Sequence, residues 1–310
     1  MAVKNNEFNI SVVIPTLNAE KFLPGLFGML NAQTLPPGEI IVIDSSSADN
    51  TINIARDSGC KVTVIPKSQF DHGGTRNLGV KQSTGNIVVF MTQDALPVNA
   101  YLLENLTKCF ADSMTGAAFA RQVPRHDADP IEYFTRNFNY PETSQLKQKN
   151  DIEKLGIKTF FFSDVCSAVR KEAFYKVGCF PEKIILNEDM CLAASMILNG
   201  YAIAYSGDAQ VWHSHDYTVS EQFRRNFDIG VSFNRNRWIL EYARAEIEGY
   251  KYFESQLSYL AKNRHFRWIP YAIWLTIAKY FGYMLGMNES KLPLHIKRKL
   301  SMHKFFWNEV

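Results

Sequence analysis

The sequence has few of the residues that mark a disulfide-stabilised, zinc-binding or fibrous protein. Its 310 residues include five cysteines, an odd number without a CxxC pair. Neither a disulfide framework nor a zinc ribbon is therefore predicted, and a reducing cytoplasm is the expected compartment. With 12 prolines and 17 glycines, the chain is too poor in both for a collagen-like or disordered protein. The first ten residues contain no apolar segment, so we expect no secretory signal.

Two further absences limit the ligands to consider. Lysine and arginine total 34 against 31 aspartates and glutamates, so the net charge of +3 gives no reason to expect nucleic acid as a partner. Neither the GxGxxG pattern of dinucleotide-binding folds nor the GxxxxGK[ST] pattern of P-loop enzymes occurs in the sequence. The sequence therefore excludes a dehydrogenase of that type and a P-loop enzyme.

Short β-branched runs alternate with helix-like segments over the first third of the chain. Their continuous apolarity predicts strands covered on both faces, as in a mainly parallel sheet, so we predict an α/β fold. These runs lie at 9–15, 39–44, 61–66, 86–91 and 116–121, and a later strand is expected at 201–206. The polar stretch 122–158 is expected to be a long functional loop with short helices.

The pattern changes near Ser220, after which the chain is helical and rich in aromatic residues. We therefore expect an α/β domain over residues 1–219 and a helical region over residues 220–310. Within the latter, the run 268–285 is about as long as a membrane-spanning helix but contains Pro270 and Lys279. Basic residues flank it on both sides, which favours attachment to a cytoplasmic membrane surface, with a plain buried helix as the alternative.

Polar side chains follow the predicted strands, where open α/β sheets bind their ligands. They are Pro15, Thr16 and Asn18 after the first run, Asp44 after the second, and Gln93 and Asp94 after the fourth. For Asp44 a turn or cap is a strong alternative, because DSSSADN is also a turn sequence. These residues are the candidates for a ligand site.

Asp94 closely follows a very apolar run, where a carboxylate needs a cation or several hydrogen-bond donors. We predict a divalent ion that bridges Asp94 and a diphosphate; a cap on the helix near Asn99 is the alternative. The segment WHSHD at 212–216 puts His213 and His215 on one face of an extended chain. Such a pair alone is more often a packing feature than a metal site.

The loop FDHGGTRN at 70–77 suggests a phosphate contact. Gly73 and Gly74 permit close backbone approach, a helix then begins, and Arg76 is expected to contact a diphosphate. A simple turn with a surface arginine is the alternative.

Glu188 and Asp189 open a predicted helix, where one of them is a candidate general base. Acidic residues also favour a first helical turn for electrostatic reasons alone. The helix dipole is expected to lower the pKa of Asp189 and keep it ionised.

Taken together, these segments resemble the inverting glycosyltransferases of family 2, which have the GT-A fold. The resemblance rests on SVVIPTLNAE, IIVIDSSSADNT, TQDA and NEDM…NGYAIAY, in order over residues 9–216. More narrowly, FDHGGTRN, TQDA, SAVRKEAF, HSHDYT and KRKLSMHKFFW resemble bacterial O-antigen and polysaccharide rhamnosyltransferases that use dTDP-L-rhamnose.

The resemblance implies a role for each candidate residue. Pro15, Thr16, Asn18, Glu20 and Gln93 would line the nucleotide sugar, Asp44 would contact the pyrimidine, and Arg76 and Asn77 the diphosphate. Asp94 would hold Mg²⁺ or Mn²⁺ together with His215, or with His213 as the alternative. Asp189 matches the catalytic base and Glu188 its neighbour on the acceptor side. The family commonly has a DxD or DD pair where TQD supplies one clear carboxylate.

The implied function is inverting transfer of L-rhamnose to a polyprenyl-diphosphate-linked saccharide, in cell-surface polysaccharide synthesis on the inner face of the bacterial cytoplasmic membrane. One carboxylate base suffices, because a leaving diphosphate needs charge neutralisation rather than a proton. Two alternatives stay open. The donor could be UDP-linked galactofuranose, N-acetylglucosamine or glucose, or the chain could be a non-catalytic partner that binds nucleotide sugar or glycan.

Overall fold

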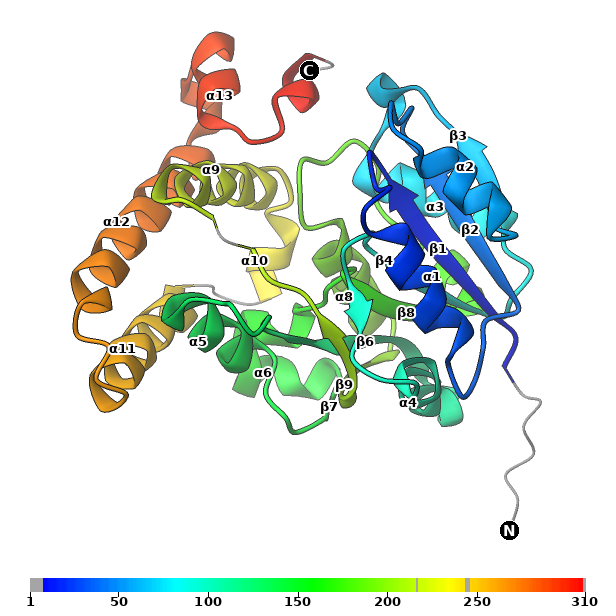
Figure 1. Cartoon of the computed structure of the whole chain (residues 1–310). Coiled ribbons are helices and arrows are strands. Elements are labelled where there is room, and N and C mark those ends of the chain that lie inside the picture. Colours follow the sequence, from blue (N-terminus) through cyan, green and yellow to red (C-terminus); the bar gives the residue numbers. More distant parts are fainter. Residues whose placement is uncertain (1–7, 216, 243–245, 309–310) are drawn as a thin grey trace.

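A computed structural model of the chain describes residues 8–215, 217–242 and 246–308 (Figure 1). Most of the N-terminal stretch expected to lack a secretory signal, and the last residue of the WHSHD segment, lie outside the described residues. The description below concerns the described residues alone.

A nine-stranded sheet forms the centre of the molecule. Its first four strands run parallel in the order β3 (Lys61–Val64), β2 (Glu39–Asp44), β1 (Ile10–Thr16) and β4 (Ile87–Met91). The next strand, β8 (Cys166–Arg170), is antiparallel to β4, and it is followed by the parallel pair β6 (Thr115–Val123) and β9 (Ala202–Trp212). The short strands β5 (Leu96–Pro97) and β7 (Gln145–Lys147) both pair antiparallel with β9. The expected α/β fold with a mainly parallel sheet is confirmed.

Helices cover both faces of this sheet, which explains the continuous apolarity of its strands. Val13 faces one core cluster and Val12 and Ile14 face the other, because neighbouring strand residues point to opposite faces. The first cluster is covered by α3 (His72–Gln82), α7 (Lys171–Lys176) and α8 (Glu188–Leu198); the second by α1 (Leu23–Asn31), α2 (Thr51–Asp57) and α4 (Leu102–Lys108).

The stretch 122–158 contains short helices, as expected, and also a short strand. It contains α5 (Pro130–Asn139), the strand β7, and the short α6 (Ile152–Leu155). Helix α5 starts with Asp129, whose Oδ1 accepts hydrogen bonds from Ile131 N and Glu132 N at 2.8 Å each, followed by Pro130 at the first helical position. This capping signal is present in the sequence, and the surrounding polar residues obscured it.

Beyond β9 the described chain is helical. The helices are α9 (Val219–Arg235), α10 (Trp238–Tyr242), α11 (Glu246–Lys262), α12 (Trp268–Met287) and α13 (Leu294–Leu300). Helices α12 and α9 pack closely (Figure 1). A Cβ at Gly282 would lie 2.3 Å from Phe223 O, and one at Gly286 would lie 2.1 Å from Phe227 O. The two glycines therefore let the helix backbones touch.

Helix α12 buries one face and exposes the other. Ala272, Leu275 and the two glycines face inward, and Lys279 lies with its Nζ 5.5 Å from the centre of the Tyr252 ring. The outward stripe consists of Ile273, Trp274, Ile277, Tyr280, Phe281, Met284 and Leu285. A plain buried helix does not describe this segment. Within the described part of the chain, no helix combines the length and apolarity needed to cross a bilayer.

Candidate active site at the carboxyl ends of the strands

Strand directions bring the candidate residues to one edge of the sheet. β1, β2 and β4 are parallel, and β6 and β9 run the same way because β8 is antiparallel to both β4 and β6. The short strand β5 then pairs Leu96 with Trp212. Asp94 comes two residues before Leu96 and His213 one residue after Trp212. The β5–β9 pairing therefore places Asp94 beside His213.

Asp94, His213 and His215 form a cluster at this edge. One potential ligand atom from each lies within 4.8 Å of the others, and His213 Nε2 is 3.5 Å from Asp94 Oδ2. The two imidazole rings meet edge to face, with centroids 4.4 Å apart. Carboxylate oxygen and imidazole nitrogen are ligands that divalent metals accept. The sequence predicted His215, or His213 as the alternative, beside Asp94; in the structure both histidines lie there.

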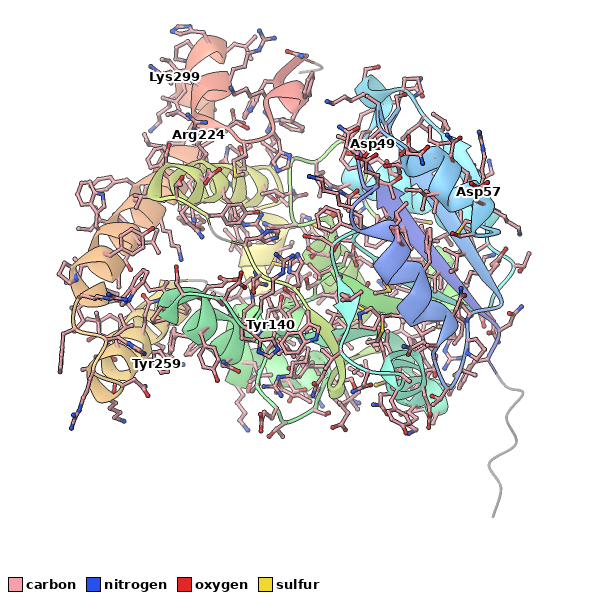
Figure 2. The ribbon with its side chains drawn as sticks, viewed as in Figure 1. Asp49, Asp57, Tyr140, Arg224, Tyr259 and Lys299 are labelled. Carbon is pink, nitrogen blue, oxygen red and sulfur yellow. The ribbon has the colours of Figure 1, made fainter. Side chains whose placement is uncertain are left out.

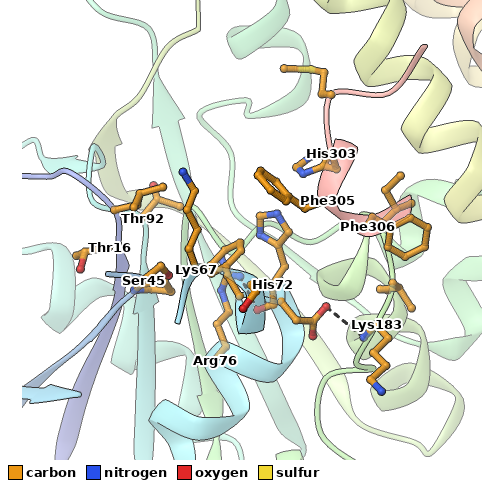
Figure 3. Close-up of a pocket in the computed structure, with 18 of the residues that line it drawn as sticks. Thr16, Ser45, Lys67, His72, Arg76, Thr92, Lys183, His303, Phe305 and Phe306 are labelled. Atoms are coloured by element: carbon orange, nitrogen blue, oxygen red, sulfur yellow. Dashed lines mark hydrogen bonds between the residues drawn. The ribbon is translucent and has the colours of Figure 1, made fainter. Parts of the chain in front are cut away.

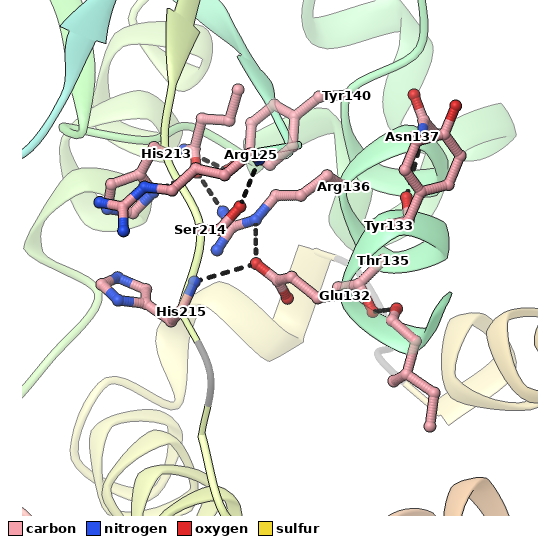
Figure 4. Close-up of polar contacts among 12 residues, drawn as sticks. Arg125, Glu132, Tyr133, Thr135, Arg136, Asn137, Tyr140, His213, Ser214 and His215 are labelled. Atoms are coloured by element: carbon pink, nitrogen blue, oxygen red, sulfur yellow. Dashed lines mark hydrogen bonds and ion pairs between the residues drawn. The ribbon is translucent and has the colours of Figure 1, made fainter. Parts of the chain in front are cut away.

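The proton position on His213 follows from its neighbours. Gln122 Oε1 accepts a hydrogen bond from Arg136 Nη1, and the Gln122 amide nitrogen donates to Tyr140 Oη at 2.7 Å. Arg136 is held in turn by Glu132, whose Oε1 accepts from Arg136 Nε at 2.6 Å (Figure 4). Because a guanidinium only donates, the Gln122 atom facing it must be the amide oxygen. The same oxygen lies 3.0 Å from His213 Nδ1, so Nδ1 carries the proton and donates it. The free lone pair of His213 is therefore on Nε2.

This lone pair faces another acceptor. Burial lowers the pKa of His213 despite the attraction of Asp94, and burial lowers the pKa of His215 to about 3. A neutral imidazole nitrogen and a carboxylate oxygen thus point at each other, an arrangement that a cation between them would stabilise. The residues fit a divalent metal.

A cavity of about 530 Å³ lies at the strand ends, where Thr16, Ser45 and Thr92 line it (Figure 3). Of the predicted nucleotide-sugar residues, Pro15, Thr16, Arg76 and Gln93 line it. A second cavity of about 480 Å³ is lined by Asp94 and again by Gln93. Gln93 holds its position by a double hydrogen bond to the backbone of Leu17, at 2.9 and 3.2 Å. Asp94 thus lines the second cavity, and its neighbour Gln93 lines both.

Other predicted residues hold the loops around the cavity. Asp44 is fully buried, and its Oδ2 accepts hydrogen bonds from Thr16 Oγ1 at 2.8 Å and Ser47 Oγ at 2.6 Å. The bond to Ser47 agrees with the alternative that Asp44 stabilises the turn in DSSSADN. Asn18 Oδ1 accepts from Ala48 N, and a Glu20 carboxylate oxygen accepts from Asn50 N. Asn18 and Glu20 are not among the described lining residues of either cavity.

Residues of the FDHGGTRN segment make most of their polar contacts with other parts of the protein. A Cβ at Gly73 would lie 2.1 Å from Pro181 O, so this glycine makes room for the backbone at 181. Gly74 N donates to Asp71 Oδ2 at 2.6 Å, which caps α3. The side chain of Asn77 bonds the backbone of Phe180 from both its amide nitrogen and its amide oxygen. The two glycines therefore serve contacts within the protein, Gly73 with Pro181 and Gly74 with Asp71, rather than the expected approach to a phosphate.

Arg76 is a buried member of a charged cluster. Its Nε lies 3.5 Å from Asp164 Oδ2, and its Nη1 lies 3.3 Å from Glu188 Oε1. Both carboxylates are buried. The alternative of a surface arginine is wrong, because only a small part of this side chain is exposed. Arg76 nevertheless reaches the cavity wall, so two buried carboxylates orient a guanidinium toward the space where a ligand would bind.

Asp189 belongs to the same charged region, and its pKa shift is opposite to the expected one. Burial raises its pKa well above the ordinary value, and the charges of Glu188 and Asp164 raise it further. The expected lowering of the pKa by the helix dipole is wrong here, because the effect of the dipole at the helix end is weaker than that of burial beside two other carboxylates. Asp189 Oδ1 accepts a hydrogen bond from Met190 N at 2.7 Å. A raised pKa makes this group a stronger base when ionised.

Several residues of the site were not predicted. Asp164 lies in a polar gap between apolar runs, but nothing near it in the sequence indicates that Arg76 is its partner. His72 lines the cavity, and its Nε2 is buried without a hydrogen-bond partner. Gln122 was placed in a loop. The C-terminal residues Met302, His303, Phe305 and Phe306 also line the cavity, and only their place in the KRKLSMHKFFW segment marked them.

The sequence is similar to two proteins from Salmonella over nearly its whole length. It is 42% identical over 304 residues to the O-antigen chain rhamnosyltransferase RfbN of Salmonella typhimurium, covering 97% of this chain and 96% of that protein. It is 43% identical over 305 residues to the O-antigen chain rhamnosyltransferase WbaN of Salmonella anatum, with the same coverage.

Solved structures support the fold, and a family pattern gives the family. A mannosyltransferase from Pyrobaculum calidifontis, in complex with GDP-Man and Mn²⁺, superposes with a TM-score of 0.59 at 17% identity, over 99% of this chain and 87% of that one. Residues 1–349 of S. aureus TarS give 0.56 at 19%, over 96% and 85%. These similarities confirm the GT-A fold. Residues 11–178 match glycosyl transferase family 2, and we conclude that the chain belongs to that family.

Proposed function

We propose that the protein is an inverting rhamnosyltransferase of O-antigen synthesis, which moves L-rhamnose from dTDP-L-rhamnose to a polyprenyl-diphosphate-linked saccharide. The observation that carries this proposal is the identity of 42% and 43% to two proteins named O-antigen chain rhamnosyltransferases, over 97% of the chain in both cases. Identity spread over both the sheet and the helical region favours a shared reaction rather than a shared fold alone.

The donor would occupy the 530 Å³ cavity. Lys67, Lys183 and Arg76 line this cavity beside one carboxylate, Asp71, so most of its charged side chains are the cations that a nucleoside diphosphate needs, although Arg76 is already paired with Asp164 and Glu188. Thr16, Ser45 and Gln93 add polar groups at the strand ends, and Ser45 Oγ is buried without a hydrogen-bond partner. A polar ligand in the cavity would give such an atom its missing partner. These features support a nucleotide-sugar site.

Asp94, His213 and His215 would hold a divalent cation, Mg²⁺ or Mn²⁺. When bound, the ion supplies positive charge that stabilises the leaving diphosphate. The protein's own groups prepare the site in advance. Gln122 keeps the lone pair of His213 on Nε2, and His215 is fixed by its backbone N, which donates to Glu132 Oε1 at 3.1 Å. A single carboxylate plus two imidazoles thus takes the place of a DxD pair.

Asp189 would be the general base. In the reaction, an acceptor hydroxyl gives its proton to an Asp189 carboxylate oxygen while its own oxygen forms a bond to the anomeric carbon. The bond from that carbon to the diphosphate breaks on the opposite face, so the configuration inverts and dTDP leaves. Glu188 already holds Arg76, whereas Asp189 is partly exposed and bonds only a neighbouring backbone amide among its described contacts. This difference supports Asp189 as the base.

The outward stripe of α12 would lie on the inner face of the cytoplasmic membrane. Trp274 and Tyr280 are 61% and 59% exposed on this stripe. Amphipathic aromatic side chains favour the membrane–water interface, and nearby cations favour anionic lipid. The exposed basic residues Arg298 and Lys299 lie on α13, at the outer end of the helical region (Figure 2). Peripheral attachment would bring the cavity close to a lipid-linked acceptor.

Vesicle sedimentation tests the attachment. Wild-type protein is mixed with phosphatidylglycerol vesicles at low salt, next to the double variant Trp274→Ser/Tyr280→Ser and the control Tyr175→Ser on α7. Wild type and control should sediment with the vesicles, and the double variant should stay in solution. If the double variant sediments like wild type, the stripe is not the membrane contact.

A donor panel tests the function. Purified protein receives Mg²⁺ or Mn²⁺, a polyprenyl-diphosphate-linked saccharide, and one donor at a time from dTDP-L-rhamnose, UDP-galactofuranose, UDP-N-acetylglucosamine and UDP-glucose. Mass spectrometry should find a product one deoxyhexose heavier with dTDP-L-rhamnose alone, and NMR should find the inverted anomeric configuration. A product only from a UDP-sugar would change the donor. Lack of turnover with all four, with nucleotide binding intact, would favour a non-catalytic partner.

A further inference from the structure

The C-terminal tail, residues 301–308, reaches the donor cavity from the helical region. Met302, His303, Phe305 and Phe306 line the cavity together with Thr16 and Ser45 of the strand ends. Figure 3 shows His303 and Phe305 pointing from the tail toward His72 on α3. Two parts of the chain that the sequence separates by more than half its length therefore enclose one space.

The tail is fixed to α9 on the side away from the cavity. Asp228, which is fully buried on α9, accepts hydrogen bonds at its Oδ2 from Met302 N at 2.8 Å and His303 N at 3.3 Å. Trp307 is buried in a cluster with Phe227 and Val231. These contacts hold the backbone of the tail, so the side chains between them keep their direction toward the cavity.

A second set of contacts secures the end of the tail. The guanidinium of Arg235 lies 5.0 Å from the Phe306 ring centre and 5.3 Å from that of Trp307. Arg235 Nε in turn donates to Glu289 Oε1 at 3.0 Å. The tail is therefore held by buried hydrogen bonds, by an indole in the core and by a cation over two rings. Such a segment is a fixed part of the cavity wall rather than a loosely attached end.

The side chains that the tail presents have the chemistry of a nucleotide site. The His303 ring packs edge to face on His72, with centroids 5.3 Å apart, and His72 Nε2 is buried without a hydrogen-bond partner. Phe305 is 68% exposed although it is a large apolar group, and Lys67 Nζ lies 5.9 Å from its ring centre. Imidazole donors, an unused aromatic face and a lysine together suit a planar base joined to a diphosphate.

We propose that the tail forms one wall of the donor site, where His303 and Phe305 contact the bound nucleotide sugar and Asp228 positions them. This inference rests on the proposed function, because it takes the occupant of the cavity to be the donor. It assigns donor binding to a region that we expected only to attach to a membrane. A nucleotide would gain from Phe305 an aromatic surface that water otherwise covers.

Calorimetric titration with dTDP tests the wall directly, because it needs neither acceptor nor turnover. The variants are Phe305→Ala and His303→Ala, and the matched control is Phe266→Ala, which removes a ring that is 61% exposed between α11 and α12. Each tail variant should bind dTDP about tenfold more weakly, which is the effect of losing one ring contact. The control should bind like wild type. Melting temperatures should stay near the wild-type value for Phe305→Ala, whose ring is largely in solvent.

A further variant separates contact from positioning. Asp228→Ala removes the acceptor of both tail amides. It should weaken dTDP binding although the side chains of His303 and Phe305 are not themselves substituted. Its near-ultraviolet circular dichroism should show a changed environment of Trp307 with unchanged far-ultraviolet signal. Restoring an acceptor oxygen with Asp228→Asn should recover much of the affinity, which general destabilisation would not allow.

Four outcomes would overturn the inference or its basis. Wild-type affinity in both Phe305→Ala and His303→Ala would remove the tail from the donor site. Tighter binding in either would mean that the tail occupies the donor's space and blocks it. If wild type binds UDP and not dTDP, the proposed donor fails, and the same variants titrated with UDP still decide on the wall. If wild type binds neither nucleotide, both proposals fail together.

Discussion

His213 Nε2 lies 3.5 Å from Asp94 Oδ2, with the proton of the imidazole on the other nitrogen. Gln122 enforces this state, because its amide oxygen takes hydrogen bonds from both Arg136 and His213 Nδ1. Two acceptors that face each other in a partly buried place are unfavourable unless a cation joins them. This is the arrangement that the divalent cation proposed for the site would stabilise.

The first prediction concerns this metal. Asp94→Asn should lower kcat by on the order of 10²-fold or more, because it removes the anionic ligand from the centre that balances the diphosphate. Calorimetry with Mn²⁺ should show the corresponding loss of metal binding. The control Asp208→Asn changes an exposed aspartate on β9 and should have no effect. Full wild-type activity in excess chelator would remove the metal from the account.

The second prediction concerns Gln122. Gln122→Leu removes the acceptor that fixes the His213 proton, so Mn²⁺ affinity should fall by roughly 10- to 100-fold. Gln122→Glu keeps an acceptor oxygen. The hydroxyls of Tyr140 and Ser163, which accept from the Gln122 amide nitrogen at 2.7 and 2.9 Å, can donate to the new carboxylate, so most of the affinity should return. Mn²⁺ titration of both variants gives the comparison. Equal affinities in the two variants would show that the tautomer of His213 does not matter.

The third prediction concerns pH. Burial and neighbouring carboxylates raise the pKa of Asp189, and a base must be ionised to act. The rate should therefore fall, as pH decreases, at a higher pH than an ordinary aspartate would allow. Asp164→Asn removes one of the negative charges that raise this pKa, so the fall should move to lower pH. The pH profiles of kcat for both proteins are the measurement. An unchanged profile would separate Asp164 from the base.

The fourth prediction concerns stability. Burial raises the pKa of Asp228 to about 6, whereas in the unfolded chain it is about 4. The folded state thus binds more protons between these values, so wild type loses stability as pH rises from 4 to 6. Asp228→Asn does not titrate, and its melting temperature relative to wild type should rise across this window, by the equivalent of up to about 3 kcal/mol, and then level off. A constant difference from pH 4 to 8 would contradict the shift.

The fold could be predicted in large part, because its signals are local. Continuous apolar runs such as 39–44 and 86–91 indicate strands covered on both faces, and the structure has β2 and β4 there. Short helices were predicted within 122–158 without their positions, although Asp129 and Pro130 mark the start of α5. The position of Asp94 after β4 was also readable from its strand alone.

The partners within the site could not be predicted, because they depend on strands that meet only in the folded chain. The antiparallel β5–β9 pair brings Asp94 to His213, and no local pattern encodes that pairing. Arg76 was predicted, but its partner Asp164 was not. The pKa of Asp189 was predicted in the wrong direction, because the helix dipole is visible in a sequence and burial beside other carboxylates is not.

Rhamnosyl transfer by Asp189→Asn tests the central claim most directly. The variant keeps the shape of the side chain but cannot accept the acceptor's proton, so with dTDP-L-rhamnose kcat should fall by roughly 10²-fold or more while dTDP binding stays at the wild-type value. Glu188→Gln is the neighbouring control, and because Glu188 holds Arg76 it should mainly weaken dTDP binding. Wild-type kcat in Asp189→Asn, with the loss of kcat appearing in Glu188→Gln instead, would contradict the assignment of the base.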